Sequence, residues 1–156
     1  MLDAPVDAWY VWVGVAAASV AALGVALSFP TAPPPDAASA AATVDSVAGC
    51  EYAATAKHPI SAEEIRLGSH RLGLRNDDGA SHATFAYGPV VPVRNGTALA
   101  AVVRGTAPAL AFDSPAAFRR AVGRARDRDG SWQWADDRLL ARCLSWEGVD
   151  ATLVAG

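Results

Sequence analysis

Residues 8–29 read AWYVWVGVAAASVAALGVALSF, and this stretch contains no charged side chain. At a rise of about 1.5 Å per residue, a helix of this length extends about 33 Å and reaches across a hydrocarbon core of about 30 Å. The sequence therefore predicts an N-terminal tail and transmembrane helix over residues 1–29. A buried core helix is the alternative, because the many Ala and Gly residues lower the hydrophobicity of the segment.

A cleaved signal peptide fits the N-terminus less well. Such a signal begins with a basic segment and carries an apolar run of about 7–15 residues. Here the tail contains Asp3 and Asp7 and no basic residue, and the apolar run is longer. We therefore expect a retained anchor, which makes the chain a single-pass protein of the cell membrane in contact with membrane lipid.

Two groups of residues in the apolar stretch have expected roles. Aromatic rings concentrate at the headgroup level of a membrane, so the predicted anchor residues are Trp9, Tyr10, Trp12 and Phe29. Small residues let a second helix approach closely, and the candidate helix-packing face consists of Gly14, Ala18 and Ala22. A generic alanine-rich helix has the same pattern.

A proline-rich linker, residues 30–36, follows the apolar stretch and cannot continue its helix. The remaining residues, 37–156, suffice for one soluble domain with its own core. Three features favour a head outside the cytoplasm: the linker itself, a glycosylation acceptor pattern at Asn95, and the expected pairing of Cys50 with Cys143, the only cysteines, in an oxidising space. A chance acceptor pattern and two unpaired buried cysteines are the alternatives.

Helix-start signals occur at three places in the head. Asp36 is a cap for a helix predicted over residues 36–49. Thr97 is a cap for a short helix. Ser114 followed by Pro115 is the clearest start in the chain, because Ser is a preferred cap and Pro is favoured at the first helical position.

Alternation of apolar and polar residues predicts the strands. Two hairpins are expected: 64–75 with 81–87, and 138–146 with 149–154. The apolar phase shifts around Gly68, which indicates a bulge, and residues 51–60 are expected to form an extended link. The predicted fold is α+β, with an antiparallel sheet of about four strands and two or three helices behind the transmembrane helix.

No residue pattern points to catalysis, a metal or a cofactor. His58, His70 and His82 are twelve residues apart, a spacing that no metal site uses. Two histidines each follow a serine, but neighbours on a strand point to opposite faces. We therefore expect a protein that is not an enzyme. With a net charge of −3, no nucleic acid partner is expected either.

Two residue groups in the head are candidate contact surfaces. The basic segment around residues 119–128 predicts a partner surface formed by Arg119, Arg120, Arg124 and Arg128, and a solvated helix face is the alternative. Trp132 and Trp134 share a face if extended and are expected to pack in the core beside Trp146, with an exposed patch as the alternative.

Five stretches carry a resemblance that covers nearly the whole chain: MLDAPVDAWYVWVGVAAASVAALGVAL, FPTAPPPDAA, HATFAYGPVVPV, FDSPAAFRRAV and LSWEGVDATLV. The chain resembles an uncharacterised haloarchaeal family of small single-span proteins, associated with genes of type IV pilus-like assembly. The resemblance implies a pilin-like or accessory envelope protein and carries over no catalytic or ligand residue.

The sequence thus favours a membrane-anchored envelope protein, acting as a pilin-like or accessory subunit of a surface assembly. Its expected partners are other membrane or envelope proteins, or a second copy of itself. The alternative is a membrane-tethered extracytoplasmic module that binds or senses a ligand. An exposed apolar patch on the head favours the first function, and a deep polar pocket favours the second.

Overall fold

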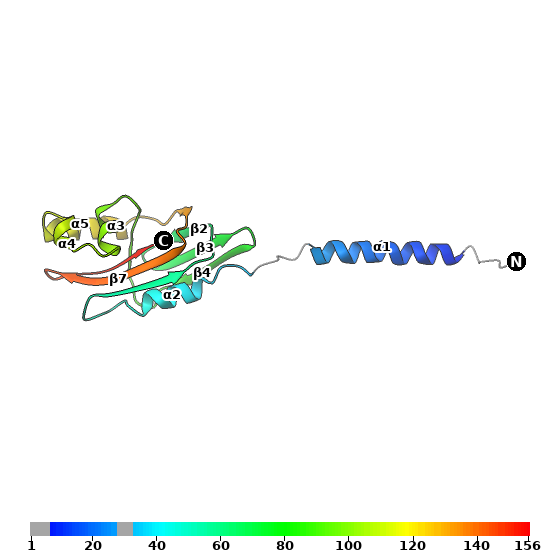
Figure 1. Cartoon of the computed structure of the whole chain (residues 1–156), viewed down its shortest axis with the longest axis horizontal. Helices are drawn as coiled ribbons and strands as arrows, with labels where there is room; N and C mark the ends of the chain where they lie inside the picture. Colours follow the sequence, from blue (N-terminus) through cyan, green and yellow to red (C-terminus); the bar gives the residue numbers. More distant parts are fainter. Residues whose placement is uncertain (1–6, 28–32) are drawn as a thin grey trace. The chain divides into compact units, whose positions relative to one another are not determined.

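The computed structural model describes residues 7–27 and 33–156, without the side chains of Asp7 and Ala8. The chain divides into two units, Met1–Pro33 and Pro34–Gly156, and the division falls inside the predicted linker. Helix α1, Asp7–Leu27, lies in the first unit (Figure 1). Its segment Trp9–Leu27 is long and apolar enough to cross a membrane. The predicted anchor Phe29 lies outside the described residues.

The head begins with helix α2, Ala37–Asp45. The carboxylate of Asp36 accepts a hydrogen bond from the backbone N–H of Ser39, which confirms the predicted cap. Turns replace the helix after Asp45, so α2 is shorter than the 36–49 expectation. Its apolar face is fully buried and consists of Ala37, Ala40, Ala41 and Val44.

The first sheet has the strand order β1-β7-β8-β5. Its centre is the predicted C-terminal hairpin, β7 (Arg138–Trp146) with β8 (Val149–Ala155), and the observed register confirms that hairpin. The expected link around residues 51–60 contains a strand, β1 (Ala54–Pro59), which pairs antiparallel with β7. The two-residue strand β5, Val91–Pro92, runs parallel to β8 at the other edge.

A second sheet has the order β4-β3-β2-β6. Its strands are β2 (Glu64–Leu67), β3 (Arg71–Asn76), β4 (Gly79–Thr84) and β6 (Trp132–Trp134). The segment predicted as one bulged strand is therefore two strands, and the bulge at Gly68 is wrong. The N–H of Gly68 donates to the carbonyl of Arg71, at 2.9 Å, and closes a turn. The shift in the alternation of apolar residues around Gly68 is therefore caused by the turn that reverses the chain between β2 and β3.

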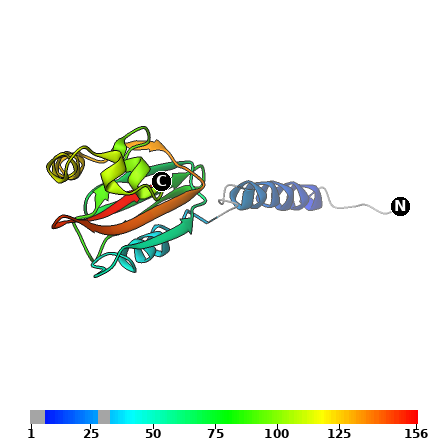
Figure 2. The same cartoon turned by 60° about the vertical axis from the view of Figure 1, so that its left-hand side comes forward.

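The residues on alternate faces of β7 belong to two different cores. Leu139 and Ala141 pack in a core with α2 and the second sheet, whereas Leu144 and its same-face neighbours pack against the remaining helices. These helices are α3 (Ala98–Val103), α4 (Pro108–Ala111) and α5 (Pro115–Arg126). Both views show α3–α5 on one side of β7 and α2 on the other (Figures 1 and 2).

The observed caps confirm the two remaining helix starts. The hydroxyl of Thr97 accepts from the N–H of Ala100 at 3.3 Å, and the hydroxyl of Ser114 accepts from the N–H of Ala117 at 3.2 Å. The α+β class is confirmed as well. In the described part of the head, however, the strands form two four-stranded sheets, and there are four helices.

Candidate functional site

The outer face of the second sheet gathers basic and aromatic side chains. Pairing places Trp132, Arg66, Gly73 and His82 in one row across four strands. The Trp132 ring lies over the Gly73 backbone, since a Cβ there would come within 3.0 Å of the ring. The guanidinium of Arg75 stacks 4.6 Å from the centre of that ring. Trp132 is therefore part of the sheet surface.

The three C-terminal tryptophans do not pack together. Trp134 is 81% exposed on the outer face of the second sheet. Trp146 instead contacts Phe118, with ring centres 5.8 Å apart, in the core on the other side of β7. The prediction that Trp132 and Trp134 pack beside Trp146 is wrong, because β6 joins the second sheet rather than the first.

The loop between α5 and β6 is held closely against β2. The Nε of Arg66 donates to the carbonyl of Gly130 at 2.7 Å. A Cβ at Gly130 would lie 2.5 Å from the carbonyl oxygen of Leu67, so only glycine permits this approach. The contact brings the end of α5 next to the β2–β3 turn, although the two segments are far apart in the sequence.

A cleft of about 340 Å³ lies between this loop and the β2–β3 turn. Its basic side chains are His70, Arg71, Arg126 and Arg128, and its acidic ones are Asp127 and Asp129. The Nε of Arg126 is buried and has no hydrogen-bond partner among the described residues. Within the described ranges, the one ion pair joins Arg75 to Glu64, so the arginines of the cleft make no direct ion pair with its two aspartates.

A smaller pocket of about 100 Å³ adjoins the cleft. Its lining residues are Arg66, Gly68, Arg71, Gly73, His82 and Gly130. Three of them, Gly68, Arg71 and Gly130, also line the cleft. We call this the basic pocket. The sequence pattern did not distinguish Arg66 or Arg71, whose one signal is proximity to the glycine at position 68, whereas Arg126 lies within the predicted basic segment but was not one of its four named arginines.

The predicted arginine surface is divided in the structure. Arg119 and Arg120 are exposed and line none of the described clefts. Arg124 and Arg128 line a separate, mainly apolar groove of about 500 Å³ between α3 and α5. Arg128 alone also reaches the cleft beside the β2–β3 turn.

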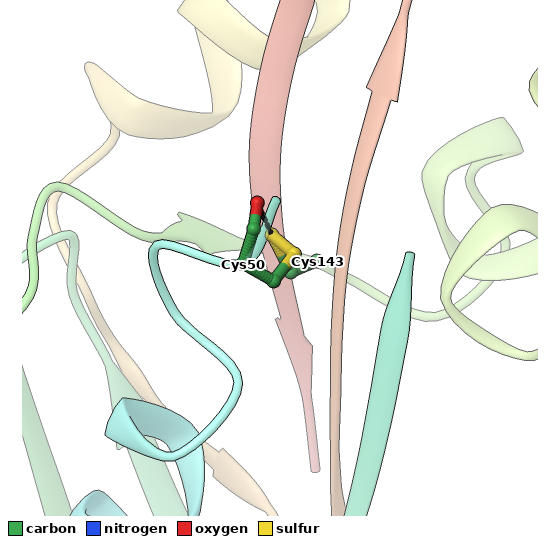
Figure 3. Close-up of a disulfide and its surroundings, with 2 residues drawn as sticks. All are labelled: Cys50 and Cys143. Carbon is green, nitrogen blue, oxygen red and sulfur yellow. Dashed lines mark hydrogen bonds between the residues drawn. A yellow bond between two sulfur atoms is a disulfide. The ribbon is translucent and has the colours of Figure 1, made fainter. Parts of the chain in front are cut away.

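Cys50 and Cys143 form a disulfide, which joins the loop after α2 to the middle of β7 (Figure 3). The two cysteines are 93 residues apart in the sequence. Cys143 is 6% exposed, so the bond lies at the edge of the packed interior. The cross-link therefore connects the start of the head to its central hairpin.

The glycosylation pattern at Asn95 also has a structural explanation. Gly96 has a positive φ of 77°, and Thr97 is the cap of α3. The exposed amide oxygen of Asn95 accepts a hydrogen bond from Arg104. A turn followed by a helix cap therefore accounts for all three residues, and glycosylation stays a prediction.

The three histidines lie apart. His58 is hydrogen-bonded to Thr43 at 3.1 Å, while His70 and His82 are exposed on the second sheet and its turn. His82 pairs with Gly73 in the β3–β4 hairpin, whose last pair is Asn76 with Gly79. The described ranges contain no group of three His, Cys, Asp or Glu side chains placed to hold a metal.

The anchor and packing residues of α1 are exposed. Trp9, Tyr10 and Trp12 are 65%, 70% and 73% exposed. The candidate packing face, Gly14, Ala18 and Ala22, is exposed as well, and a Cβ at Gly14 would meet nothing within 4 Å. Association through this face stays a prediction.

The fold and surface together define a class of protein: an apolar N-terminal helix of membrane-spanning length, followed by a small, disulfide-bonded α+β head. The chain belongs to the Family of unknown function (DUF7283), which matches residues 3–144. No curated protein matches the chain, and neither does any solved structure.

Proposed function

We propose that this protein is a non-enzymatic envelope protein that crosses the membrane once and holds its head outside the cytoplasm. In this proposal it is a pilin-like or accessory subunit of a surface assembly, from a haloarchaeal family. The observation that carries the proposal is the division of the chain into two units. One contains an exposed apolar helix of membrane-spanning length, and the other is the folded head. An apolar helix of this length is stable in lipid, where all its backbone groups bond internally.

The disulfide supports the extracytoplasmic side. Disulfides persist in oxidising compartments and are rare where thiol reductants are abundant. The Cys50–Cys143 bond joins two segments of the head, so the folded head carries it as a structural cross-link. The positive-inside rule predicts orientation from the Lys and Arg residues on either side of a span. It makes no prediction here, because no Lys or Arg lies near the span.

The linker favours an accessory subunit over the core of a filament. In pilins the apolar helix continues into the head, whereas residues 33–36 of this chain are not helical. Prolines at 33, 34 and 35 have no N–H to donate to a helix. The head is therefore joined by a spacer, which suits a subunit that presents its head to partners.

A second function, a tethered module that binds a ligand, is favoured by one observation. The basic pocket and the adjoining cleft are concave and polar, and their arginines have no ion-pair partner among the described residues. Such a surface has the convergent polar groups that ligand sites require.

Labelling of a single surface cysteine tests the proposed orientation. Ala116 is exposed on α5, and Ala116→Cys adds a thiol to a chain whose own cysteines are paired. We expect a membrane-impermeant maleimide to label this variant in intact cells and to leave the wild-type protein unlabelled. Labelling only after the cells are permeabilised would place the head in the cytoplasm and overturn the orientation.

Leucine substitutions on α1 test self-assembly. If the small-residue face packs against a second helix, Gly14→Leu or Ala18→Leu weakens association by about threefold to tenfold, because the larger side chain separates the backbones. Cross-linking in mild detergent measures the dimer fraction. Ala16→Leu, on the opposite side of the helix, is the matched control. Equal cross-linking in all these variants would contradict packing through this face.

A further inference from the structure

The basic pocket on the outer face of the second sheet is lined only by basic side chains and glycine. We propose that it binds a tetrahedral oxyanion, the phosphate or sulfate group of an ester. Planar guanidinium groups donate paired, charge-assisted hydrogen bonds to such oxygens. The pocket volume, about 100 Å³, holds the equivalent of about three waters, which suits one such group. This site concerns the head alone and is independent of the proposed assembly role.

One arginine of the pocket is held in place before any ligand arrives. Arg66 is held through its Nε by the carbonyl of Gly130, which leaves both terminal nitrogens of its guanidinium available. Gly73 lets the rings of Trp132 and His82 lie close against the sheet, because a Cβ there would come within 3.0 Å and 3.1 Å of them. A donor that is already held loses little conformational entropy on binding, which favours Arg66 as the fixed contact, while Arg71 is exposed at the rim.

Unlike Arg75, the two arginines of the pocket lack an acidic partner. Arg75 pairs with Glu64 on the neighbouring strand. No carboxylate among the described residues lies within ion-pair distance of Arg66 or Arg71, and none lines the pocket. An oxyanion would supply the missing negative charge.

The adjoining cleft accommodates the rest of the ester. It shares Arg71 with the pocket and adds Arg126 and Arg128, together with the acidic side chains of Asp127 and Asp129. Those two carboxylates line the cleft and not the pocket, so the pocket is the favoured place for the oxyanion. Arg126 brings a further positive charge to the cleft, and its Nε is buried without a hydrogen-bond partner among the described residues.

Helix electrostatics alone do not explain this arrangement. Cations stabilise the C-terminal turn of a helix, which accounts for Arg124 and Arg126 in the last turn of α5. The arginines of the basic pocket come from β2 and β3 instead. Their position opposite Gly130 is set by the register of the second sheet and by the loop contact.

Titration of the full chain in a maltoside detergent tests the proposal. The probes are inorganic sulfate, inorganic phosphate and glucose 6-sulfate, with glucose and chloride at equal ionic strength as negative controls. Binding is followed by calorimetry and by the NMR signals of arginine Nε–H groups. We expect saturable binding and a shifted Arg66 signal, and Arg71→Gln lowers the affinity about tenfold or more, because one charge-assisted contact is lost.

Two variants make the test specific. Arg119→Gln removes an exposed arginine of α5 that lines no described cleft, and it leaves the affinity unchanged. Arg71→Lys keeps the charge, loses the planar fork and gives an intermediate affinity. Arg128→Gln distinguishes the two sources of the anion. If the affinity falls only for glucose 6-sulfate, the natural ligand is an ester whose organic part occupies the cleft. If the affinity is unchanged for every probe, the natural ligand is a free anion. Absence of saturable binding, or equal losses in Arg71→Gln and Arg119→Gln, would overturn the proposal.

Discussion

The variant that carries both Cys50→Ser and Cys143→Ser loses about 3–5 kcal/mol of the free energy of unfolding of the head. The disulfide closes a loop with a sequence separation of 93 residues. In the chain-entropy account, a cross-link over such a loop restricts the unfolded chain by about 4–5 kcal/mol, and removal of a native disulfide typically costs about 2–5 kcal/mol. Since small domains are stable by only about 5–15 kcal/mol, this loss is a large share of the total.

Urea unfolding of the full chain in detergent, with and without reductant, measures this effect. Reduced wild-type protein and the double variant should unfold at similar urea concentrations, well below that of the oxidised wild type. Reductant should leave the double variant unchanged, which controls for effects of the reagent itself. If the oxidised wild type and the double variant unfold at the same midpoint urea concentration, the cross-link does not stabilise the head.

Phe118→Ala is expected to destabilise the head by about 3–5 kcal/mol, because it removes a large aromatic side chain from a packed interior. Phe118 has no exposed surface. Its ring meets those of Phe112 and Trp146 edge-on, with ring centres 5.3 Å and 5.8 Å apart. The substitution removes both contacts and the anchor that holds α5 against the first sheet.

The same denaturation experiment checks this prediction with two controls. Phe118→Leu keeps an apolar side chain and should cost about 1–2 kcal/mol. Arg119→Ala is the neighbouring exposed position, and surface changes of this kind usually stay within about 0.5 kcal/mol. A loss below about 1 kcal/mol for Phe118→Ala would mean that the core collapses around the missing ring.

The two effects arise in different ways and should add when combined. The disulfide acts chiefly on the unfolded chain, whereas Phe118 contributes packing in the folded state. Cys143 and Leu144 lie next to each other on β7, but their side chains alternate across the sheet, and Phe118 packs on the Leu144 side. A triple variant of this kind is expected to lose most of the stability of the head.

Features that depend on neighbouring residues were predictable from the sequence. The caps at Asp36, Thr97 and Ser114 are confirmed because each side-chain oxygen bonds an N–H only three residues away. The C-terminal hairpin is confirmed for the same reason, since Glu147 and Gly148 form a tight turn between alternating strands.

Features that depend on distant pairing were missed. β1 carries no distinctive apolar pattern, and its strand conformation follows from pairing with β7. The turn at Gly68 and the exposure of Trp134 likewise depend on which sheet each strand joins. Single sequence windows contain no information on those partners.

The sequence by itself therefore determined the apolar helix, the proline break, the α+β class and the starts of three of the four described helices of the head. These follow from hydrophobic length, backbone geometry and local capping. Only the tertiary structure placed Arg66 beside Gly130, across 64 residues of sequence, and so assembled the basic pocket. A local signal acts over a few residues, whereas a pocket requires strand register and packing to bring remote side chains together.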